Sequence, residues 1–431
     1  MSKEENRKNF SKYVSQNILG MIGFSCYVLA DSYFISIAKG ADGLTALNLV
    51  MPLYSIIFSI GEMIGVGSAI RYAISKIKKD ADADDYFWNA IIWCIMSSMI
   101  FVFAGIFFSS DIMRVLGADE HIVAVGNNYT KIFMCFAPMF MCNYVTNAFV
   151  RNDGAPGIAM SATLFSSLFN IVFDYILMFP MNLGMEGAAL ATALSPIIGM
   201  GICSIHFFSK KSSVRLVVCK PSVRKLVAGS QLGVSAFVGE MSSAVITLAF
   251  NFVILKLAGN VGVAAYGVVA NIAIVTTAVF NGVAQGSQPL ISSCFGRGDK
   301  DGCTQLKRMG YTTAFVLAAV MYSILFIFAG QFVAVFNSEG SEMLRLYATE
   351  GVKLYFIGIF FAGINIVGGG AFSATEDAFK AAVVSVARGF VLILGAVFVM
   401  SALFGMTGIW LCLPVTEAIV CIVTFFFLRK F

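Results

Sequence analysis

The stretch LFNIVFDY, residues 168–175, lies inside an apolar run from Ile158 to Met181 that is long enough to cross a bilayer. Asn170 and Asp174 are four residues apart, so on a helix they lie on one face, about one turn from each other. A carboxylate deep in such a run costs roughly 2.5 to 3.5 kcal/mol on insertion scales, so we expect it to have a function. The rest of the chain must supply its partners.

The composition is typical of a polytopic α-helical membrane protein. Of 431 residues, 58% are hydrophobic and 12% are charged, whereas about a quarter are charged in an ordinary soluble domain. The ten cysteines form no CxxC pair and the two histidines, His121 and His206, are far apart, which disfavours haem, zinc and redox chemistry. The chain contains no GxxxxGK[ST] loop, so an internal ATPase is excluded. We expect no enzyme, no cofactor beyond a coupling ion and no nucleic-acid partner.

Hydropathy predicts an all-α integral membrane protein with twelve transmembrane helices. Their approximate ranges are 10–38, 46–72, 87–110, 122–150, 158–181, 187–208, 225–256, 263–294, 310–336, 346–374, 378–402 and 407–429. Of the 29 lysines and arginines, 23 lie in or beside the termini and the alternate connections that share their side. By the positive-inside rule both termini are cytoplasmic, in a multi-pass protein of the plasma (inner) membrane.

A basic stretch divides the predicted spans into two sets of six. We expect an N-terminal lobe at 1–208 that carries the ion site, a basic cytoplasmic linker at 209–224 and a C-terminal lobe at 225–431. The linker charges are interpreted as a solvated, topology-setting segment, with a lipid or partner site as the alternative.

The two halves repeat weakly. Gly67-Ser68 corresponds to Gly286-Ser287 at an offset of 219, and Gly184-Met185-x-Gly187 corresponds to Gly405-Met406-x-Gly408. Because six is even, both copies have the same orientation, as in parallel-repeat transporters that frame a central cavity.

Four polar residues of the first lobe are predicted to lie at similar depths. Asp31 in span 1 and Asp174 in span 5 each lie about seven residues short of the outer end. Thr192 lies about five residues into span 6, and Asn170 is one turn deeper. Two carboxyls, an amide and a hydroxyl there would form either a proton-sharing pair of acids or an oxygen cage for Na⁺. A polar staple between helices is the structural alternative.

The repeat provides an internal control for this cluster. Its four positions fall on apolar residues of the second lobe: Phe250, Ile393, Val397 and Leu413. Helix adhesion alone would be expected in both lobes, so the asymmetry suggests that ion coupling belongs to the first lobe.

Other polar residues are also embedded in spans. Asn143 and Asn147 share a face of span 4 and could extend the polar network or serve packing. Glu240 and Glu62 could attract a cationic substrate or hold a second cation, or could be satisfied at a cavity edge. Arg388 is expected to snorkel to the cytoplasmic surface rather than bind substrate.

The order of several motifs resembles a known family. The resemblance is to the multidrug and toxic compound extrusion (MATE) family, in its bacterial and archaeal branch related to DNA-damage-inducible transporters. The motifs are Asp31 at the end of span 1, Arg151-Asn152-Asp153-Gly154 before span 5, Asn170-x-x-x-Asp174 in span 5 and Gly187-Ala188-Ala189-Leu190-Ala191-Thr192 in span 6.

The resemblance implies two pseudo-symmetric six-helix bundles that face each other in a V, with export of organic cations driven by inward H⁺ or Na⁺ flow. In that branch the residues that match Asp31, Asn170, Asp174 and Thr192 form the coupling site. In the branch named for norfloxacin resistance, a glutamate of span 7 pairs with an aspartate of span 10. Glu240 matches the first of these, but Ala362 stands at the second, so that second sodium site is not carried over.

The sequence therefore predicts a monomeric antiporter for amphipathic or cationic small molecules, coupled to H⁺ or Na⁺ through Asp31 and Asp174 and in contact with membrane lipid. The alternative is a flippase for lipid-linked or polysaccharide precursors. The embedded charges are mainly acidic, whereas a cationic cavity is typical of lipid II flippases.

Overall fold

The computed structural model describes residues 3–336 and 341–429, and within these ranges it contains helices and connections but no strand. Lys430, one of the basic residues behind the orientation prediction, lies outside them. The first half comprises α1 (Lys3–Lys78), α2 (Asp85–Val115), α3 (Glu120–Cys135), α4 (Ala137–Asn152), α5 (Pro156–Met178) and α6 (Gly184–Phe207). The second comprises α7 (Val223–Gly296), α8 (Lys300–Ile327), α9 (Ala329–Phe336), α10 (Glu342–Tyr355), the 3₁₀ turn η1 (Phe356–Gly358), α11 (Ile359–Ala374), α12 (Ala378–Val386), the π-helix η2 (Ala387–Val391) and α13 (Leu392–Arg429).

Three of these helices break at a glycine with positive φ. The glycines are Gly40 in α1 (φ 59°), Gly259 in α7 (φ 61°) and Gly405 in α13 (φ 59°), a conformation that favours a residue without a Cβ. The 74 residues of α7 would extend about 110 Å if straight, far more than the roughly 30 Å hydrocarbon core. Phe250 and Tyr266, on either side of Gly259, stack at 5.0 Å, so α7 folds back on itself.

These breaks account for the number of passes. In the described ranges nine helical segments are long and apolar enough to cross a membrane, with α1 already divided at its break, and α3 and α4 form a tenth span bent by 46°. The bend precedes Pro138, which lacks a backbone N–H. Because α7 and the segment from α12 to the end of α13 each supply two passes, the described residues make the twelve predicted spans.

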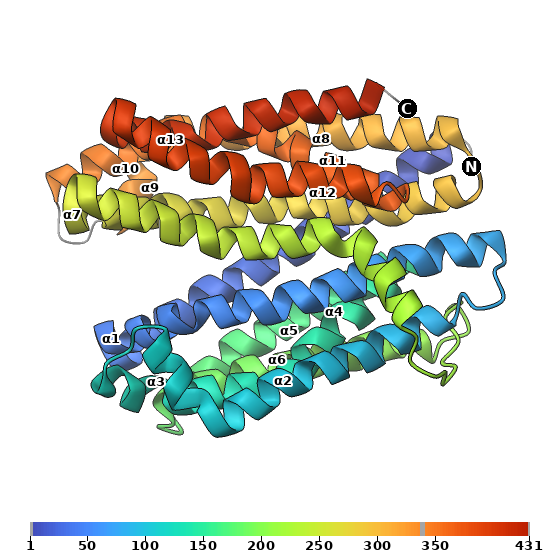
Figure 1. Cartoon of the computed structure of the whole chain (residues 1–431), viewed down its shortest axis with the longest axis horizontal. Coiled ribbons are helices and arrows are strands. Elements are labelled where there is room, and N and C mark those ends of the chain that lie inside the picture. The colour runs from blue at the N-terminus through green and yellow to red at the C-terminus, as the bar shows by residue number, and fades with distance from the viewer. Residues whose placement is uncertain (1–2, 337–340, 430–431) are drawn as a thin grey trace.

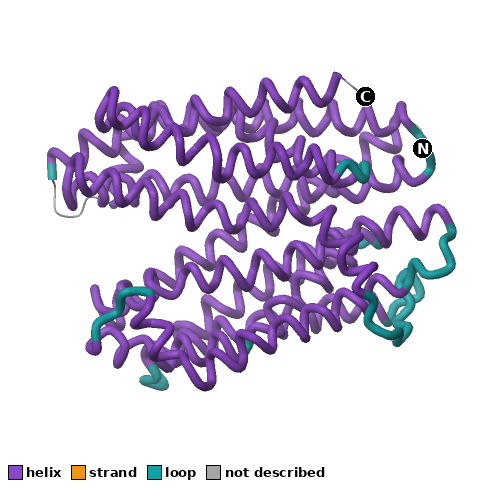
Figure 2. Tube along the Cα trace, in the orientation of Figure 1, coloured by secondary structure: helices purple, strands orange, loops and turns teal. Residues whose placement is uncertain are grey.

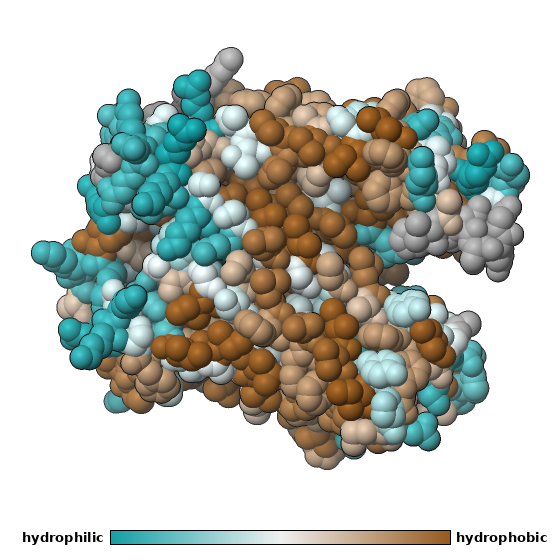
Figure 3. Space-filling model, turned by 180° about the vertical axis from the view of Figure 1, so that it is seen from behind, coloured by the Kyte–Doolittle hydropathy of each residue, from teal (hydrophilic) through white to brown (hydrophobic). Residues whose placement is uncertain are grey.

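The two halves form separate bundles that diverge toward one end of the molecule (Figure 1). The helices run along the long axis, with the loops gathered at the two ends (Figure 2). The start of α1 and the end of α13 lie at the same end of the molecule, as an even number of passes requires (Figure 1). A cleft opens between the lobes at the opposite end, and apolar residues dominate the middle of the surface (Figure 3). The fold is therefore the V-shaped, all-α membrane architecture that was predicted.

Each lobe has its own hydrophobic core. The core of the first lobe includes Tyr54 and Phe133, and the core of the second includes Phe250 and Trp410. Phe10, near the start of α1, packs into the second core, so the first pass contributes to both lobes.

Close backbone contact joins the lobes on the side of the termini. A Cβ on Gly67 would lie 2.1 Å from the carbonyl oxygen of Gly229, and one on Gly233 would lie 2.0 Å from that of Met63. We call the residues without side chains at this contact the glycine seam: Gly67, Gly229, Gly233, Gly282 and Gly286. The seam contains Gly67 and Gly286, which the repeat predicts to be equivalent.

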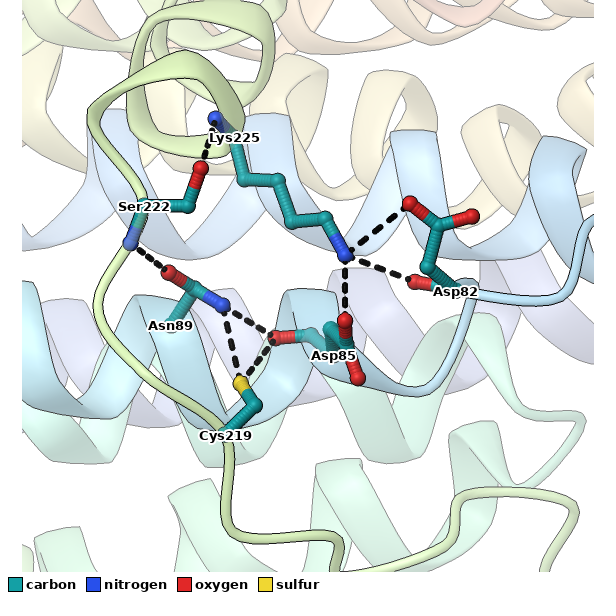
Figure 4. A network of polar contacts seen from close by, with 6 residues as sticks. All are labelled: Asp82, Asp85, Asn89, Cys219, Ser222 and Lys225. Atoms are coloured by element: carbon teal, nitrogen blue, oxygen red, sulfur yellow. Dashed lines mark hydrogen bonds and ion pairs between the residues drawn. The ribbon is translucent and has the colours of Figure 1, made fainter.

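The connection between α6 and α7 is tied to the first lobe (Figure 4). The backbone N–H of Ser222 donates to Asn89 Oδ1 at 2.6 Å, and the Asn89 amide contacts Cys219 Sγ at 3.0 Å. Lys225 then bridges to Asp85 at 2.5 Å and Asp82 at 3.2 Å. The hydrogen bond and charge of Lys225 lower the pKa of Asp82. The start of the second lobe is therefore anchored to the first.

Candidate functional site

Three helices bring the four predicted cluster residues together. Asp31 lies on the first pass of α1, Asn170 and Asp174 on α5, and Thr192 on α6, and all four are buried. The carboxyl groups of Asp31 and Asp174 lie within side-chain hydrogen-bonding reach of each other.

Asn170 is the hub of this cluster. In the amide orientation that gives both its atoms complementary partners, its NH₂ donates to Asp174 Oδ2 at 3.1 Å. Its oxygen accepts from the hydroxyl and the backbone N–H of Thr192, each at 3.2 Å. The predicted spacing on α5 therefore places the amide between the carboxyl of its own helix and the hydroxyl of α6.

Small residues allow α6 to approach α5 this closely. A Cβ on Gly187 would lie 2.8 Å from the carbonyl carbon of Leu177, so only glycine fits there. Ala188, Ala189 and Ala191 are fully buried along the same helix. The run of small residues before Thr192 thus lets its short side chain reach Asn170.

The surroundings of the Asp31 and Asp174 carboxyl groups offer few hydrogen-bond donors. Among the described residues no group donates to Oδ1 of Asp31 or of Asp174, and both atoms are buried. Ionised carboxylates only accept hydrogen bonds, so contact between them needs a shared proton or a small cation. The chemistry of this contact is therefore that of a shared proton or a bound monovalent cation.

Tyrosines surround the cluster, and sequence reasoning missed them. The Tyr27 side chain interacts electrostatically with Asp31, Asp174 and Glu240. The hydroxyls of Tyr54 and Tyr129 hydrogen-bond to each other beside the acids. Tyr27 could have been found, because it precedes Asp31 by four residues and so shares its helical face.

A cavity adjoins the cluster on the side of the termini. It has a volume of about 110 Å³, and its wall includes all four of the other predicted polar residues. Apolar and aromatic side chains line much of the rest, including Met21, Phe24, Phe58, Phe140 and Tyr144. The predicted residues in its wall are Glu62, Asn143, Asn147 and Glu240.

The two asparagines of α4 differ in their contacts. Asn147 donates to the carbonyl of Ala159 and the hydroxyl of Thr163, each at 3.1 Å, and so joins α4 to α5. Asn143 Oδ1 is buried and accepts from no described group. Asn147 therefore has a packing contact, while Asn143 leaves an acceptor in the cavity wall.

Arg388 does not snorkel, and that prediction is wrong. Its guanidinium contacts Glu417 Oε1 at 2.7 and 3.0 Å, and the glutamate side chain is only 3% exposed. Asn365 donates to Glu417 Oε2 at 2.7 Å, and Thr424 donates to Asn365 at 2.9 Å. The buried carboxylate draws the guanidinium inward, and the π-helix η2 carries Arg388 at this point.

Comparisons with known proteins agree on one family. The MatE family profile matches residues 17–176 and 236–399. The multidrug export protein MepA of Staphylococcus aureus (strain MRSA252) is 27% identical over 414 residues, covering 93% of this chain and 89% of the relative. MepA of Staphylococcus saprophyticus is 26% identical over 410 residues, with the same coverage.

Solved structures share the fold at lower identity. One is an outward-facing conformation of a multidrug resistance MATE family transporter of the MOP superfamily, with a TM-score of 0.92 and 20% identity over 99% of this chain and 95% of that one. Another is a MOP superfamily transporter from Pyrococcus furiosus Vc1, with a TM-score of 0.91 and the same identity and coverage. Its description reports a binding pocket of reverse polarity that suggests a different function.

Proposed function

The chain belongs to the MatE family, and we propose that this membrane transporter is a secondary antiporter that exports amphipathic organic cations in exchange for H⁺ or Na⁺. It is not an enzyme. The relatives named as multidrug export proteins support the substrate class. The observation that carries the coupling proposal is the contact between the buried Asp31 and Asp174 carboxyls on two different helices.

The amide orientation assigned to Asn170 from its hydrogen-bond partners favours the proton as the coupling ion. In that orientation the NH₂ faces Asp174, and a donor would repel a sodium ion there. Its oxygen, the atom that sodium would need, already accepts two hydrogen bonds from Thr192. A proton shared by the two carboxyls fits this arrangement without moving any of these groups, whereas a sodium ion requires the amide to turn.

The cavity supports a cationic, partly aromatic substrate. Glu62 and Glu240 contribute carboxyl groups to its wall, and the rings beside them offer apolar and π surfaces to a cation. The methionines are deformable and suit ligands of different shapes.

The coupling cycle follows from the position of the two sites. We assign the termini to the cytoplasm from the excess of lysine and arginine on that side, so the cleft opposite them faces outward. A proton that enters from outside joins the carboxyl pair and weakens drug binding in the adjoining cavity. By linkage, drug and ion must each weaken the binding of the other.

Transport in proteoliposomes with separately imposed pH and sodium gradients tests this proposal. With tetraphenylphosphonium as the transported probe, we expect an imposed pH gradient to drive accumulation of the probe against its own concentration gradient. Asp31→Asn and Asp174→Asn should each reduce gradient-driven transport by about tenfold or more, as expected for a typical coupling free energy. Asp111→Asn, at an exposed surface carboxyl, is the matched control.

The outcomes separate the alternatives. Transport driven only by sodium would assign the cluster to Na⁺ instead of H⁺. Gradient-driven transport at the wild-type rate in both aspartate variants would contradict the coupling role.

A further inference from the structure

The cavity is not built from the first lobe alone. Most of its lining comes from α1, α4, α5 and α6, but Glu240 and Gln285 come from α7 of the second lobe. Because the wall of this cavity spans both lobes, its shape changes when the lobes move. Movement of the second lobe therefore moves Glu240 and Gln285 relative to a bound substrate.

Gln285 makes two contacts across the lobe boundary. Its carbonyl oxygen accepts from the Arg151 guanidinium at 2.5 Å, and its NH₂ donates to Glu62 Oε1 at 3.2 Å. Both partners belong to the first lobe and are buried, Arg151 with 5% and Glu62 with 8% of its surface exposed. One amide of the second lobe is thus held between a cation and an anion of the first.

The neighbours of Gln285 fix its position. Gly282 and Gly286 belong to the glycine seam, and a Cβ on either would lie 2.6 to 2.8 Å from Cα atoms of the first pass of α1. The backbone that carries Gln285 therefore presses directly on the first pass of α1, which contributes to both cores. If the lobes separate at this end, the amide must leave Glu62 and Arg151.

Glu62 is also one of the two cavity carboxyls that the proposed function gives to the cationic substrate. It interacts electrostatically with Arg151 and Glu240. Arg151 is further tied to Asn17 at 3.2 Å, so it stays in place when Gln285 withdraws. The same carboxyl oxygen can accept from Gln285 or from a bound cation, but the two compete.

We infer that Gln285 is a displacement ligand: when the lobes close on the side of the termini, α7 delivers its amide to Glu62 and expels the cationic substrate toward the open cleft. This inference rests on the proposed function. With the lobes apart, Glu62 is free to bind a cation that enters from the side of the termini. With the lobes closed, as in this structure, the amide occupies Glu62 and lowers the affinity of the cavity for substrate.

The test compares two glutamines of the second half that both hydrogen-bond to helices of the first half. Gln305 on α8 accepts from Asn6 at 3.2 Å and donates to the Lys3 carbonyl at 3.0 Å, and it is not part of the cavity wall. Gln285→Met and Gln305→Met each replace one amide side chain with an apolar side chain of similar size. Binding of tetraphenylphosphonium to the full chain in nanodiscs is measured for both, and for each combined with Glu62→Gln.

We expect Gln285→Met to raise the affinity about tenfold, the size expected when one competing hydrogen bond to a charged group is lost. Gln305→Met should leave affinity unchanged, and Glu62→Gln should abolish the gain. Equal affinities in the two methionine variants, or a gain that survives Glu62→Gln, overturn the displacement role.

Two further results complete the design. If Gln285→Met does not fold, Gln285→Asn provides the same test, since its shorter side chain cannot reach both partners. Absence of saturable binding to the wild-type chain contradicts the proposed function together with this role, whereas binding that Gln285→Met leaves unchanged contradicts this role alone.

Discussion

The two lobes repeat the same six-helix plan but treat buried carboxyl groups differently. In the first lobe, Asp31 and Asp174 face each other, and among the described residues no basic side chain hydrogen-bonds to them. In the second lobe, the buried Glu417 is neutralised by Arg388. The guanidinium of Arg388 belongs to the chain, so it neutralises Glu417 permanently. The Asp31–Asp174 pair lacks such a partner among the described residues and can be neutralised only by a mobile cation.

The repeat-equivalent positions support this contrast. Phe250, Ile393 and Val397, which correspond to Asp31, Asn170 and Asp174, are buried in the core of the second lobe. Under the proposed function, ion uptake requires an acid without a counter-ion, and a buried carboxyl alone is not sufficient.

The largest effect is expected for Arg388→Met. Removing one partner of a buried pair leaves an uncompensated charge and costs about 3–5 kcal/mol. The variant should unfold at a clearly lower temperature in a thermal-unfolding experiment, while the folded fraction keeps its gradient-driven transport.

The double variant Arg388→Met with Glu417→Gln is the control. It removes the uncompensated charge, keeps an acceptor for Asn365 and should recover most of the lost stability. If Arg388→Met were as stable as the wild type but insensitive to the ion gradient, the second lobe would take part in coupling and the contrast between the lobes would be broken.

A smaller effect is expected from the two equivalent glycines of the seam. Gly67→Ala and Gly286→Ala place a Cβ 2.1 Å and 2.8 Å from backbone atoms of the opposite lobe, and overpacking of this kind costs about 1–3 kcal/mol. Both should separate the lobes on the side of the termini, Gly67→Ala more strongly. Distances between spin labels on the two lobes measure the shift.

Gly267→Ala is the matched control, because a Cβ there meets nothing within 4 Å. Equal distances in all three variants would show that the seam does not hold the lobes together.

The smallest effect is expected at the end where the cleft opens. The hydrogen bond and charge of Asp42 raise the pKa of His121 above its ordinary value of 6.5. Because the folded-state pKa is raised, the contact stabilises the protein fully below pH 6.5, and this contribution is lost as the pH rises through the folded-state pKa. The second lobe has Val261 in place of Asp42 at the repeat offset, so this pH dependence belongs to the first lobe.

Titration of His121 by NMR checks this prediction, with His206 resonances as the internal reference. Asp42→Asn should return the His121 pKa toward 6.5, and high salt should do so in part because the pair is exposed. An unchanged titration in Asp42→Asn would show that another group sets the His121 pKa.

Hydropathy and spacing predicted twelve passes in two sets of six, whereas the V arrangement of the two bundles was predicted from the resemblance to the MATE family. The twelve passes can be read from the chain. So can the repeat equivalence of Gly67 with Gly286 and of Gly184 with Gly405. The turns at the glycines that break α1, α7 and α13 were not predicted, although the ends of the predicted spans fall near them. Tyr27 left a signal in its spacing from Asp31, whereas Tyr54 and Tyr129 left none.

The sequence by itself determined which residues must be accounted for. The cost of placing a carboxyl or an amide in an apolar run is a local property, so Asp31, Asn170, Asp174 and Thr192 are recognisable from the apolar residues that surround them in the chain. Only the tertiary structure decided which buried charges are paired. Arg388 meets Glu417 across 29 residues and Gln285 meets Glu62 across 223, and such contacts depend on how helices rotate and how the lobes dock, which no local pattern encodes.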